Sequence, residues 1–327
     1  MNLENKFSIP FNGIEDIEKY YDTFKDRGKY IHDVYMAVPT LFDSHIIYSG
    51  NSELRFIEKY KSKFNITLTF NSQYYGKLTK EFIDNQFKEK VNDFLYDNNI
   101  YGVIISDFYI GKKIRENFPD IKLYTSCNID QYNLGTIQMW DEILHIDCFN
   151  LPREYGRNIE AIKKVKQKGF KTKVLLNEVC KLYCENGLKH RLAQSMNEDY
   201  INFMDTASSY DYKLNTLRSC LVIPRWLKYI DNYVDVYKLF GKTYDLEYLS
   251  SMFDCYLQQR NDILLRDLMR PGCPSMQRNF KYYDLPVSML DDELMFCNME
   301  NCKSCNKCRK NIEKYDKFFN QSNIIFI

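Results

Sequence analysis

Short runs of β-branched and aromatic residues alternate with amphipathic stretches along most of this chain. The runs are candidate strands at residues 34–38, 66–70, 101–105, 122–126, 143–147, 172–176, 219–223 and 234–239. Between them, apolar residues recur at helical spacing, with Lys and Glu on the opposite face. Parallel strands are joined by right-handed crossovers whose helices cover the outside of the sheet. Eight strand and helix repeats therefore predict an α/β fold, the closed (β/α)8 or TIM-like barrel.

The seventh candidate strand is the least regular, because SCLVIPRW contains a proline and also fits a strand end or a loop. After about Gly241 the alternation stops. We therefore predict two domains, a barrel over residues 1–243 and a helical, cysteine-rich appendage over residues 244–327. A chain of 327 residues is long enough for one barrel and a small addition.

The charges of the chain nearly cancel, with 45 basic and 44 acidic side chains. A global field that would draw the protein onto nucleic acid or a membrane is therefore not expected. No apolar run approaches the ~20 residues of a spanning helix, and the N-terminus lacks the pattern of a signal peptide. These features predict a cytoplasmic protein without a membrane partner. Thiols stay reduced in the cytoplasm, so the 11 cysteines indicate metal ligation rather than a disulfide framework.

Four cysteines lie within twelve residues of the C-terminal segment FCNMENCKSCNKCRKN. They are Cys297, Cys302, Cys305 and Cys308, spaced C-x4-C-x2-C-x2-C. Four thiolates this close suit an iron–sulfur cluster or a tetrahedral zinc ion. The C-x2-C-x2-C portion is more typical of clusters, and zinc is the alternative.

A second group of cysteines follows the sixth candidate strand in LLNEVCKLYCENGLKHR. Cys180 and Cys184 need partners from elsewhere in the chain, and we expect these to be Cys220 and Cys273. Cys127 and Cys148 are also candidates, although a buried cysteine is often only a small apolar residue. The spacing leaves open whether the chain builds one cluster or two.

Polar residues gather where several candidate strands end, which is the catalytic face of a barrel. They are Asn71, Gln73, Ser106, Asp107, Cys127, Asn128, Asp147, Cys148, Asn177, Glu178, Cys180 and Lys238. Glu178 or Asp107 would act as acid or base if burial shifts its pKa. Arg153 would clamp a carboxylate or phosphate, and an ion pair at the rim explains Arg153 and Glu154 equally well.

Three stretches of residues 95–250 resemble the peptidase U32, or collagenase-like, family. They begin ISDFYIGKK, FNLPREYGR and LVIPRWLKY, and the most specific portions are Pro152 to Glu154 and Asn177 to Cys184. The resemblance implies a barrel that carries a four-cysteine iron–sulfur cluster. The better-understood relatives carry out oxygen-independent hydroxylation of a quinone precursor or of RNA bases. This sequence has a shorter gap between its first cysteines than those enzymes, so the full ligand set and the substrate stay open.

We therefore predict an iron–sulfur enzyme, most simply with a 4Fe–4S cluster. It would act on a small molecule or RNA, with an electron donor or other protein as a possible partner. The site would include Asp107, Arg153, Glu154, Asn177, Glu178 and Lys238. A peptidase is an alternative, although H-E-x-x-H and G-x-S-x-G are absent from the sequence. A non-catalytic scaffold or electron-transfer protein is another. No nucleotide fingerprint or P-loop appears.

Overall fold

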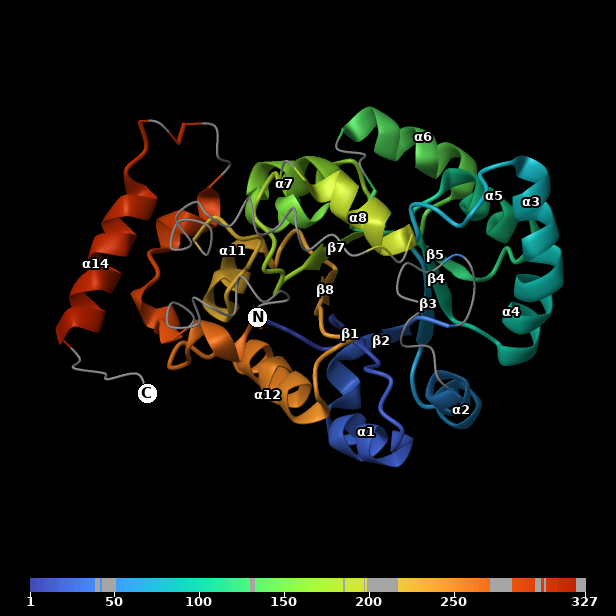
Figure 1. The fold of residues 1–327 in the computed structure, drawn as a ribbon, viewed down its shortest axis with the longest axis horizontal. Helices are drawn as coiled ribbons and strands as arrows, with labels where there is room; N and C mark the ends of the chain where they lie inside the picture. The colour runs from blue at the N-terminus through green and yellow to red at the C-terminus, as the bar shows by residue number, and fades with distance from the viewer. Residues whose placement is uncertain are drawn as a thin grey trace.

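The structure, a computed structural model, describes residues 1–38, 42, 51–129, 133–184, 186–196, 198, 217–270, 284–297, 301–302 and 304–321. The described residues form an eight-stranded parallel sheet in the order β5-β4-β3-β2-β1-β8-β7-β6. Its strands are β1 Phe7–Pro10, β2 Ile31–Met36, β3 Ile66–Phe70, β4 Gly102–Ile105, β5 Lys122–Thr125, β6 Phe149–Asn150, β7 Thr172–Leu175 and β8 Val236–Lys238. A single parallel bridge between Tyr124 and Cys148 joins the two outer strands. The predicted (β/α)8 barrel is thereby confirmed (Figure 1).

The predicted number of strands is right, but two of the predicted strands are wrong. Residues 143 and 144 end helix α6, Leu134–Leu144, whose C-cap His145 is left-handed, and β6 begins only at Phe149. Residues 219–223 lie outside the barrel and pair with the segment that follows β7. The strand that sequence reasoning missed is β1, whose four residues FSIP end in a proline.

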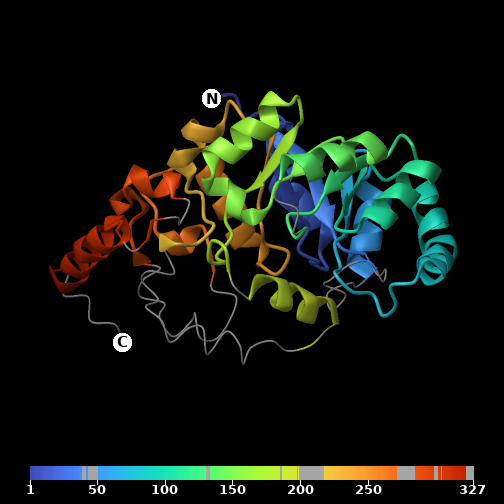
Figure 2. The ribbon, with the colours of Figure 1, turned by 90° about the horizontal axis from the view of Figure 1, so that it is seen from above.

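The barrel is surrounded by helices (Figures 1 and 2). The α-helices are α1 Ile17–Phe24, α2 Asn51–Tyr60, α3 Lys80–Gln86, α4 Asn92–Asn98, α5 Phe108–Asn117, α6, α7 Ile159–Gln167, α8 Gly187–Met196, α11 Leu227–Ile230, α12 Leu246–Leu257 and α14 Lys307–Gln321. The 3-10 helices are η1 Lys25–Tyr30, η4 Arg153–Arg157, η5 Pro224–Trp226, η6 Leu265–Asp267, η8 Val287–Met289 and η9 Asp292–Phe296. A π-helical segment, η3 Phe87–Val91, joins α3 to α4. Side-chain caps fix several helix starts, as where Asp16 accepts from the Lys19 amide and Asp245 from that of Tyr248.

The two faces of the barrel strands differ in chemistry. In β1, Phe7 and Ile9 join the large apolar core, while Ser8 between them hydrogen bonds a lysine from across the barrel. That lysine is Lys173 of β7, and it forms an ion pair with Asp33 of β2 at 3.1 Å, with both side chains fully buried. Period-two alternation in β1 therefore points Phe7 and Ile9 toward the helices and Ser8 into the barrel. The barrel interior combines the Lys173–Asp33 pair with a small second cluster that includes Tyr35, Ile104 and Tyr124.

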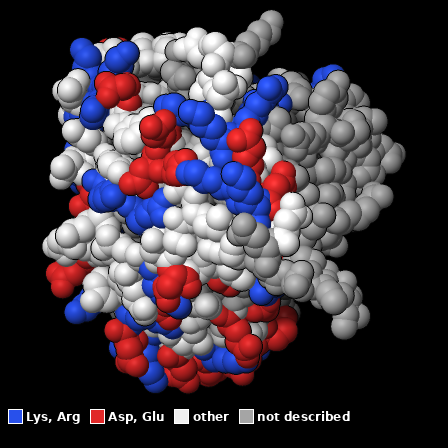
Figure 3. Space-filling view, turned by 90° about the vertical axis from the view of Figure 1, so that its left-hand side faces the viewer, with Lys and Arg blue, Asp and Glu red and all other residues white. Residues whose placement is uncertain are grey.

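The helices after β8 continue onto the barrel before the chain reaches its tail. Phe253 of α12 packs edge-on against Phe7, and Asp254 forms an ion pair with Arg27 at 2.6 Å. Helix α14 lies at the far end of the molecule, beyond α11 (Figure 1). The face on the α14 side carries basic and acidic side chains interspersed among its described residues (Figure 3). The predicted domain division at residues 243 and 244 stays a prediction.

Candidate functional site at the barrel mouth

Arg153 lies at the centre of the predicted site. The short β6 ends at Asn150, and Pro152 leads into η4, which places the Arg153 guanidinium over the carboxyl end of the barrel. One terminal nitrogen, Nη1, donates to Glu178 Oε2 and to Cys180 Sγ, at 3.3 Å each. The other, Nη2, donates to the side-chain oxygen of Asn128, which follows β5. Arg153, which follows β6, thus joins residues that follow β5 and β7.

Cys180 and Cys220 lie on two adjacent backbone segments. The chain leaving β7 and the chain at residues 218–222 run antiparallel, with a bridge between Lys181 and Ser219. The Cys220 amide donates to the Cys180 carbonyl oxygen at 2.8 Å, and the Leu182 amide donates to that of Arg218 at 2.7 Å. Two thiols that are forty residues apart in sequence therefore come from hydrogen-bonded neighbours.

The remaining predicted cluster ligands of this group lie nearby or outside the described residues. Cys184 is half-buried, four residues after Cys180 and just before helix α8. Cys273 lies outside the described residues. Helix α8 then extends toward β3, where its Ser195 hydroxyl accepts from the Gln73 amide at 2.8 Å. Cys184 thus lies just before a helix that borders the barrel mouth.

The thiols of this group fit an iron–sulfur cluster in their chemistry and placement. Cys180, Cys184 and Cys220 come from two paired segments, and the Arg153 guanidinium offers positive charge beside them. Among the described residues, no three His, Cys, Asp or Glu side chains are grouped closely enough to hold one metal ion. Cysteine thiolates are the ligands that iron–sulfur clusters take, so the donor set fits such a cluster in its chemistry.

Charge and burial act against one another around Arg153. Burial alone would lower the pKa of Arg153, but the Glu178 carboxylate and the neighbouring thiols hold it well above its usual value. Burial raises the pKa of the Cys180 thiol, with a further contribution from Glu178, while Arg153 opposes both. Glu178 also accepts from the Cys180 amide at 3.1 Å, so its carboxylate fixes the backbone that carries the thiol.

Lys238 at the end of β8 brings a buried amine to the same end of the barrel. Its Nζ lies 4.3 Å from the centre of the Tyr35 ring, and the residue is 5% exposed. Burial lowers the pKa of Lys238 to about 8, although the Cys127 thiol acts in the opposite direction. An amine with this pKa can both give and take a proton near neutral pH.

Three other predicted site residues have clear structural partners. The Asn177 side chain donates to the Phe240 carbonyl at 2.9 Å and accepts from the Phe240 amide at 2.6 Å, which ties β7 to the segment after β8. Asp107 caps helix α5 through the Ile110 amide and accepts from the Tyr75 hydroxyl at 2.9 Å. Glu154 is buried in η4 beside Arg153. The catalytic roles of all three stay predictions.

The placement of Asp147 on the catalytic rim is wrong. Its carboxylate accepts from the Leu123 amide at 2.9 Å, at the start of β5, and pairs with Arg115 at 3.1 Å. These contacts put Asp147 at the amino end of the barrel. The error follows from the misplaced strand, because β6 begins two residues after Asp147 rather than ending there.

One contributor to the site region, Arg157, was missed from the sequence. Arg157, 2% exposed, donates to the carbonyl oxygens of Leu217 and Ser219 at 2.8 Å each and also to that of Leu294. Asn128 receives the Arg153 hydrogen bond, although we had singled it out only as a rim residue. Both arginines belong to the single motif PREYGR, and that spacing was the available signal.

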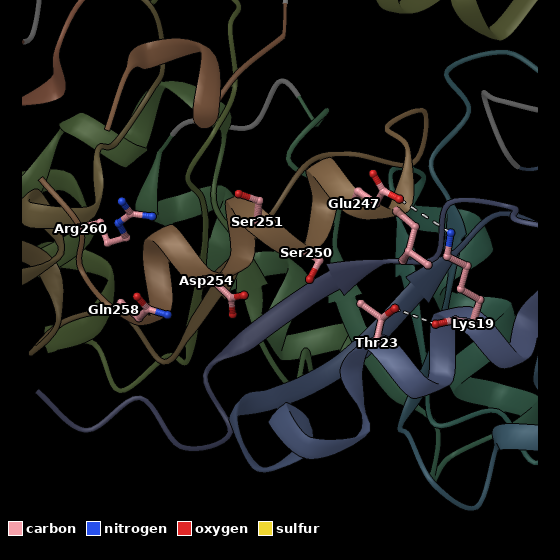
Figure 4. A pocket seen from close by; sticks show the side chains of 9 residues that line it. Lys19, Thr23, Glu247, Ser250, Ser251, Asp254, Gln258 and Arg260 are labelled. Atoms are coloured by element: carbon pink, nitrogen blue, oxygen red, sulfur yellow. Dashed lines mark hydrogen bonds and ion pairs between the residues drawn. The ribbon is translucent and has the colours of Figure 1, made fainter. Parts of the chain in front are cut away.

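A surface hollow lies elsewhere, between helices α1 and α12 (Figure 4). Its described lining includes Lys19, Glu247, Ser250, Asp254 and Arg260 from the outside of the helical layer. None of the predicted site residues lines it, because helix side chains rather than strand ends surround it. The predicted chemistry therefore does not involve this hollow.

Comparisons with known proteins agree on one family. A profile of peptidase family U32 matches residues 51–272. An uncharacterized protease of Methanocaldococcus jannaschii is 23% identical over 320 residues, which cover 92% of this chain and 93% of that protein. A solved structure of a U32 peptidase aligns with a TM-score of 0.54 and 9% identity, over 74% of this chain and 94% of the other, and supports the barrel fold.

The helices among the described residues were compared with the length and apolarity of a membrane span. None of them is long and apolar enough to cross a bilayer.

Proposed function

This chain belongs to peptidase family U32, and from that premise we propose that it is an iron–sulfur enzyme that modifies its substrate without oxygen. The proposed cluster is of the 4Fe–4S type, held by Cys180, Cys184 and Cys220 with Cys273 as the fourth ligand. The proposed reaction is a hydroxylation or a related modification of a small molecule or an RNA base. In a hydroxylation, an organic hydroxyl donor as co-substrate would pass its oxygen atom to the substrate and be reduced by two electrons. A cluster bound here would supply one-electron redox chemistry.

One observation carries the proposal: the Cys220 amide donates to the Cys180 carbonyl, beside an arginine that touches the Cys180 sulfur. Hydrogen-bonded backbones hold both thiols at the end of the barrel where substrates bind in this fold. The guanidinium compensates negative charge on a thiolate-bound cluster. The guanidinium cannot accept a proton, so a cysteine peptidase at this position would have to use the Glu178 carboxylate beside the Cys180 thiol as its base.

The surrounding side chains favour a small or inserted anionic substrate. The Arg153 and Glu178 side chains are only 15% and 8% exposed. The buried Arg153 Nε has no partner within the described part of the chain. Arg153 would therefore orient a carboxylate or phosphate through Nε, while Lys238 would hold or deliver a proton from the floor of the pocket. Burial of these groups suits a metabolite or a flipped base better than an extended polymer.

The first test is the metal content of protein purified without oxygen. We expect about four irons with matching sulfide for the barrel site, and their loss in Cys180→Ala. Cys255→Ala is the matched control, because Cys255 is a buried thiol on α12 away from the mouth. Iron that is unchanged in Cys180→Ala would contradict the assignment of this ligand.

A second test addresses the reaction. Cluster-loaded protein, reduced anaerobically, is incubated with cell metabolite and RNA fractions, and products that gain one oxygen atom are sought by mass spectrometry. The same preparations are assayed on casein and gelatin. Proteolysis that persists in Cys180→Ala without any oxygen-bearing product would favour the hydrolase suggested by the names of the relatives.

A further inference from the structure

The four tail cysteines take no part in the site proposed above. Cys297 follows η9, and Cys308 lies in the first turn of α14, so the two ends of the motif belong to packed elements. Asp291 and Asn311 exchange hydrogen bonds of 3.2 and 3.1 Å, and Lys314 pairs with Asp291 at 2.6 Å. These contacts clamp the start of η9 to α14 and keep Cys297 and Cys308 near one another.

The residues between these ends include a tight turn. The Cys305 and Ser304 amides donate to the Asn301 carbonyl at 2.8 and 3.1 Å. Cys302 and Cys305 therefore lie on either side of one turn, and Cys308 follows one helical turn later. A C-x2-C-x2-C run of this kind is the one used by bacterial ferredoxins, whereas structural zinc more often takes two separated cysteine pairs.

Arg157 connects this tail to the thiols of the barrel mouth. Its buried guanidinium donates to the Ser219 carbonyl, next to Cys220, and to the Leu294 carbonyl, three residues before Cys297. Arg218, also adjacent to Ser219, hydrogen bonds the Cys308 sulfur. The two thiol groups thus share a pair of arginines, and those positive charges lie between them.

We propose that Cys297, Cys302, Cys305 and Cys308 bind a second 4Fe–4S cluster that exchanges single electrons with the cluster at the barrel mouth. Among the described residues, the tail cysteines are not grouped closely enough to hold a single metal ion. In each transfer the reduced tail cluster loses one electron and the oxidised barrel cluster gains it. A low-potential one-electron donor protein re-reduces the tail. The relay, though not the tail site itself, rests on the proposed function.

The test is iron and sulfide analysis of full-length protein reconstituted anaerobically with iron and sulfide. We expect about eight irons in the wild type and about four in either Cys302→Ala/Cys305→Ala or Cys180→Ala/Cys220→Ala. Cys305→Ser is a milder tail variant, and circular dichroism of each protein verifies that it folds. Full iron in both folded tail variants, or one zinc per chain at the tail in place of iron, would overturn the second cluster.

Electron paramagnetic resonance of the dithionite-reduced protein tests the relay. Two neighbouring paramagnetic clusters give a spectrum broadened by spin coupling, and each double variant should give the simple spectrum of one isolated cluster. A wild-type spectrum equal to the sum of the two variant spectra would overturn the relay and leave the tail site standing. Iron lost only from the tail variants would instead overturn the proposed function, because the barrel cluster would then be absent.

Discussion

The two ends of the barrel interior both contain a buried cation and a carboxylate, but they use them differently. At the amino end, Lys173 lies between Asp33 and Ser8, and the ion pair is completely buried. At the mouth, Arg153 divides its donors among a carboxylate, an amide and a thiol, and water still reaches the pair. The first arrangement is complete without a ligand, whereas the second offers an unpartnered nitrogen. The fully buried Lys173–Asp33 pair, here called the closed pair, stabilises the fold. The Arg153–Glu178 pair, here called the mouth pair, is available for binding.

The largest expected effect comes from breaking the closed pair. Lys173→Met leaves the Asp33 carboxylate buried without its cation and should lower the free energy of unfolding by about 3–5 kcal/mol. Burial acts to raise the pKa of Asp33, but Lys173 and His32 outweigh it and hold that pKa below its usual value. Urea denaturation of metal-free protein measures the change. Lys173→Met/Asp33→Leu is the control and should recover much of the loss, and a single variant within about 1 kcal/mol of wild type would contradict this.

The next effect is a pH dependence at the mouth. Lys238 has a pKa of about 8 in the folded chain, against an ordinary value of 10.5. Between these values the unfolded chain binds a proton that the folded chain does not, so this group makes unfolding free energy rise with pH. The gain approaches about 3 kcal/mol across the window. Lys238→Met should be the more stable protein at neutral pH, with an advantage that shrinks as the pH rises. Parallel stability curves for the two proteins would refute this.

The smallest expected effect is the loss of stability when the carboxylate of Glu178 at the barrel mouth is removed. Glu178→Gln keeps one side-chain oxygen, which can accept from the Cys180 amide, and loses the second oxygen, which accepts from Arg153. The Arg153 and Glu178 side chains both remain partly in contact with water. We expect the free energy of unfolding to change by less than about 1 kcal/mol, with iron content retained. The same urea titration as for Lys173→Met measures it. A loss of several kcal/mol would show that the mouth pair is as structural as the closed one.

The strands that sequence reasoning located well have buried residues on both faces. Residues 66–70 and 172–176 match β3 and β7 almost residue for residue, because β-branched and apolar residues dominate both stretches and only Lys173 interrupts them. Phe7–Pro10 escaped notice because four residues ending in proline give too short a pattern. Ile143 and Leu144 resemble the start of a strand in sequence, although both lie in α6, where Leu144 continues the buried face of Ile137 and Trp140 and Ile143 is exposed.

The candidate site was predictable in composition but not in arrangement. The polar residues and cysteines after the strands could be chosen from the sequence, since the barrel fixes where strands end. The pairing of residues 218–222 with the chain after β7 could not, because an extended buried run carries no signal for its partner or direction. That pairing is what brings Cys220 to Cys180.

The extent of backbone pairing between neighbouring strands differs greatly around the barrel. Strands β1 to β5 are consecutive in sequence and in the sheet, each paired with the next, while β5 meets the last three strands through one bridge. During synthesis, the first five strands can therefore assemble as a continuous curved sheet before the rest of the chain leaves the ribosome. The later strands then add along β1 through β8, and the contact between Tyr124 and Cys148 forms last. We expect nascent chains that end after β5 to resist proteolysis better than chains that end after β3.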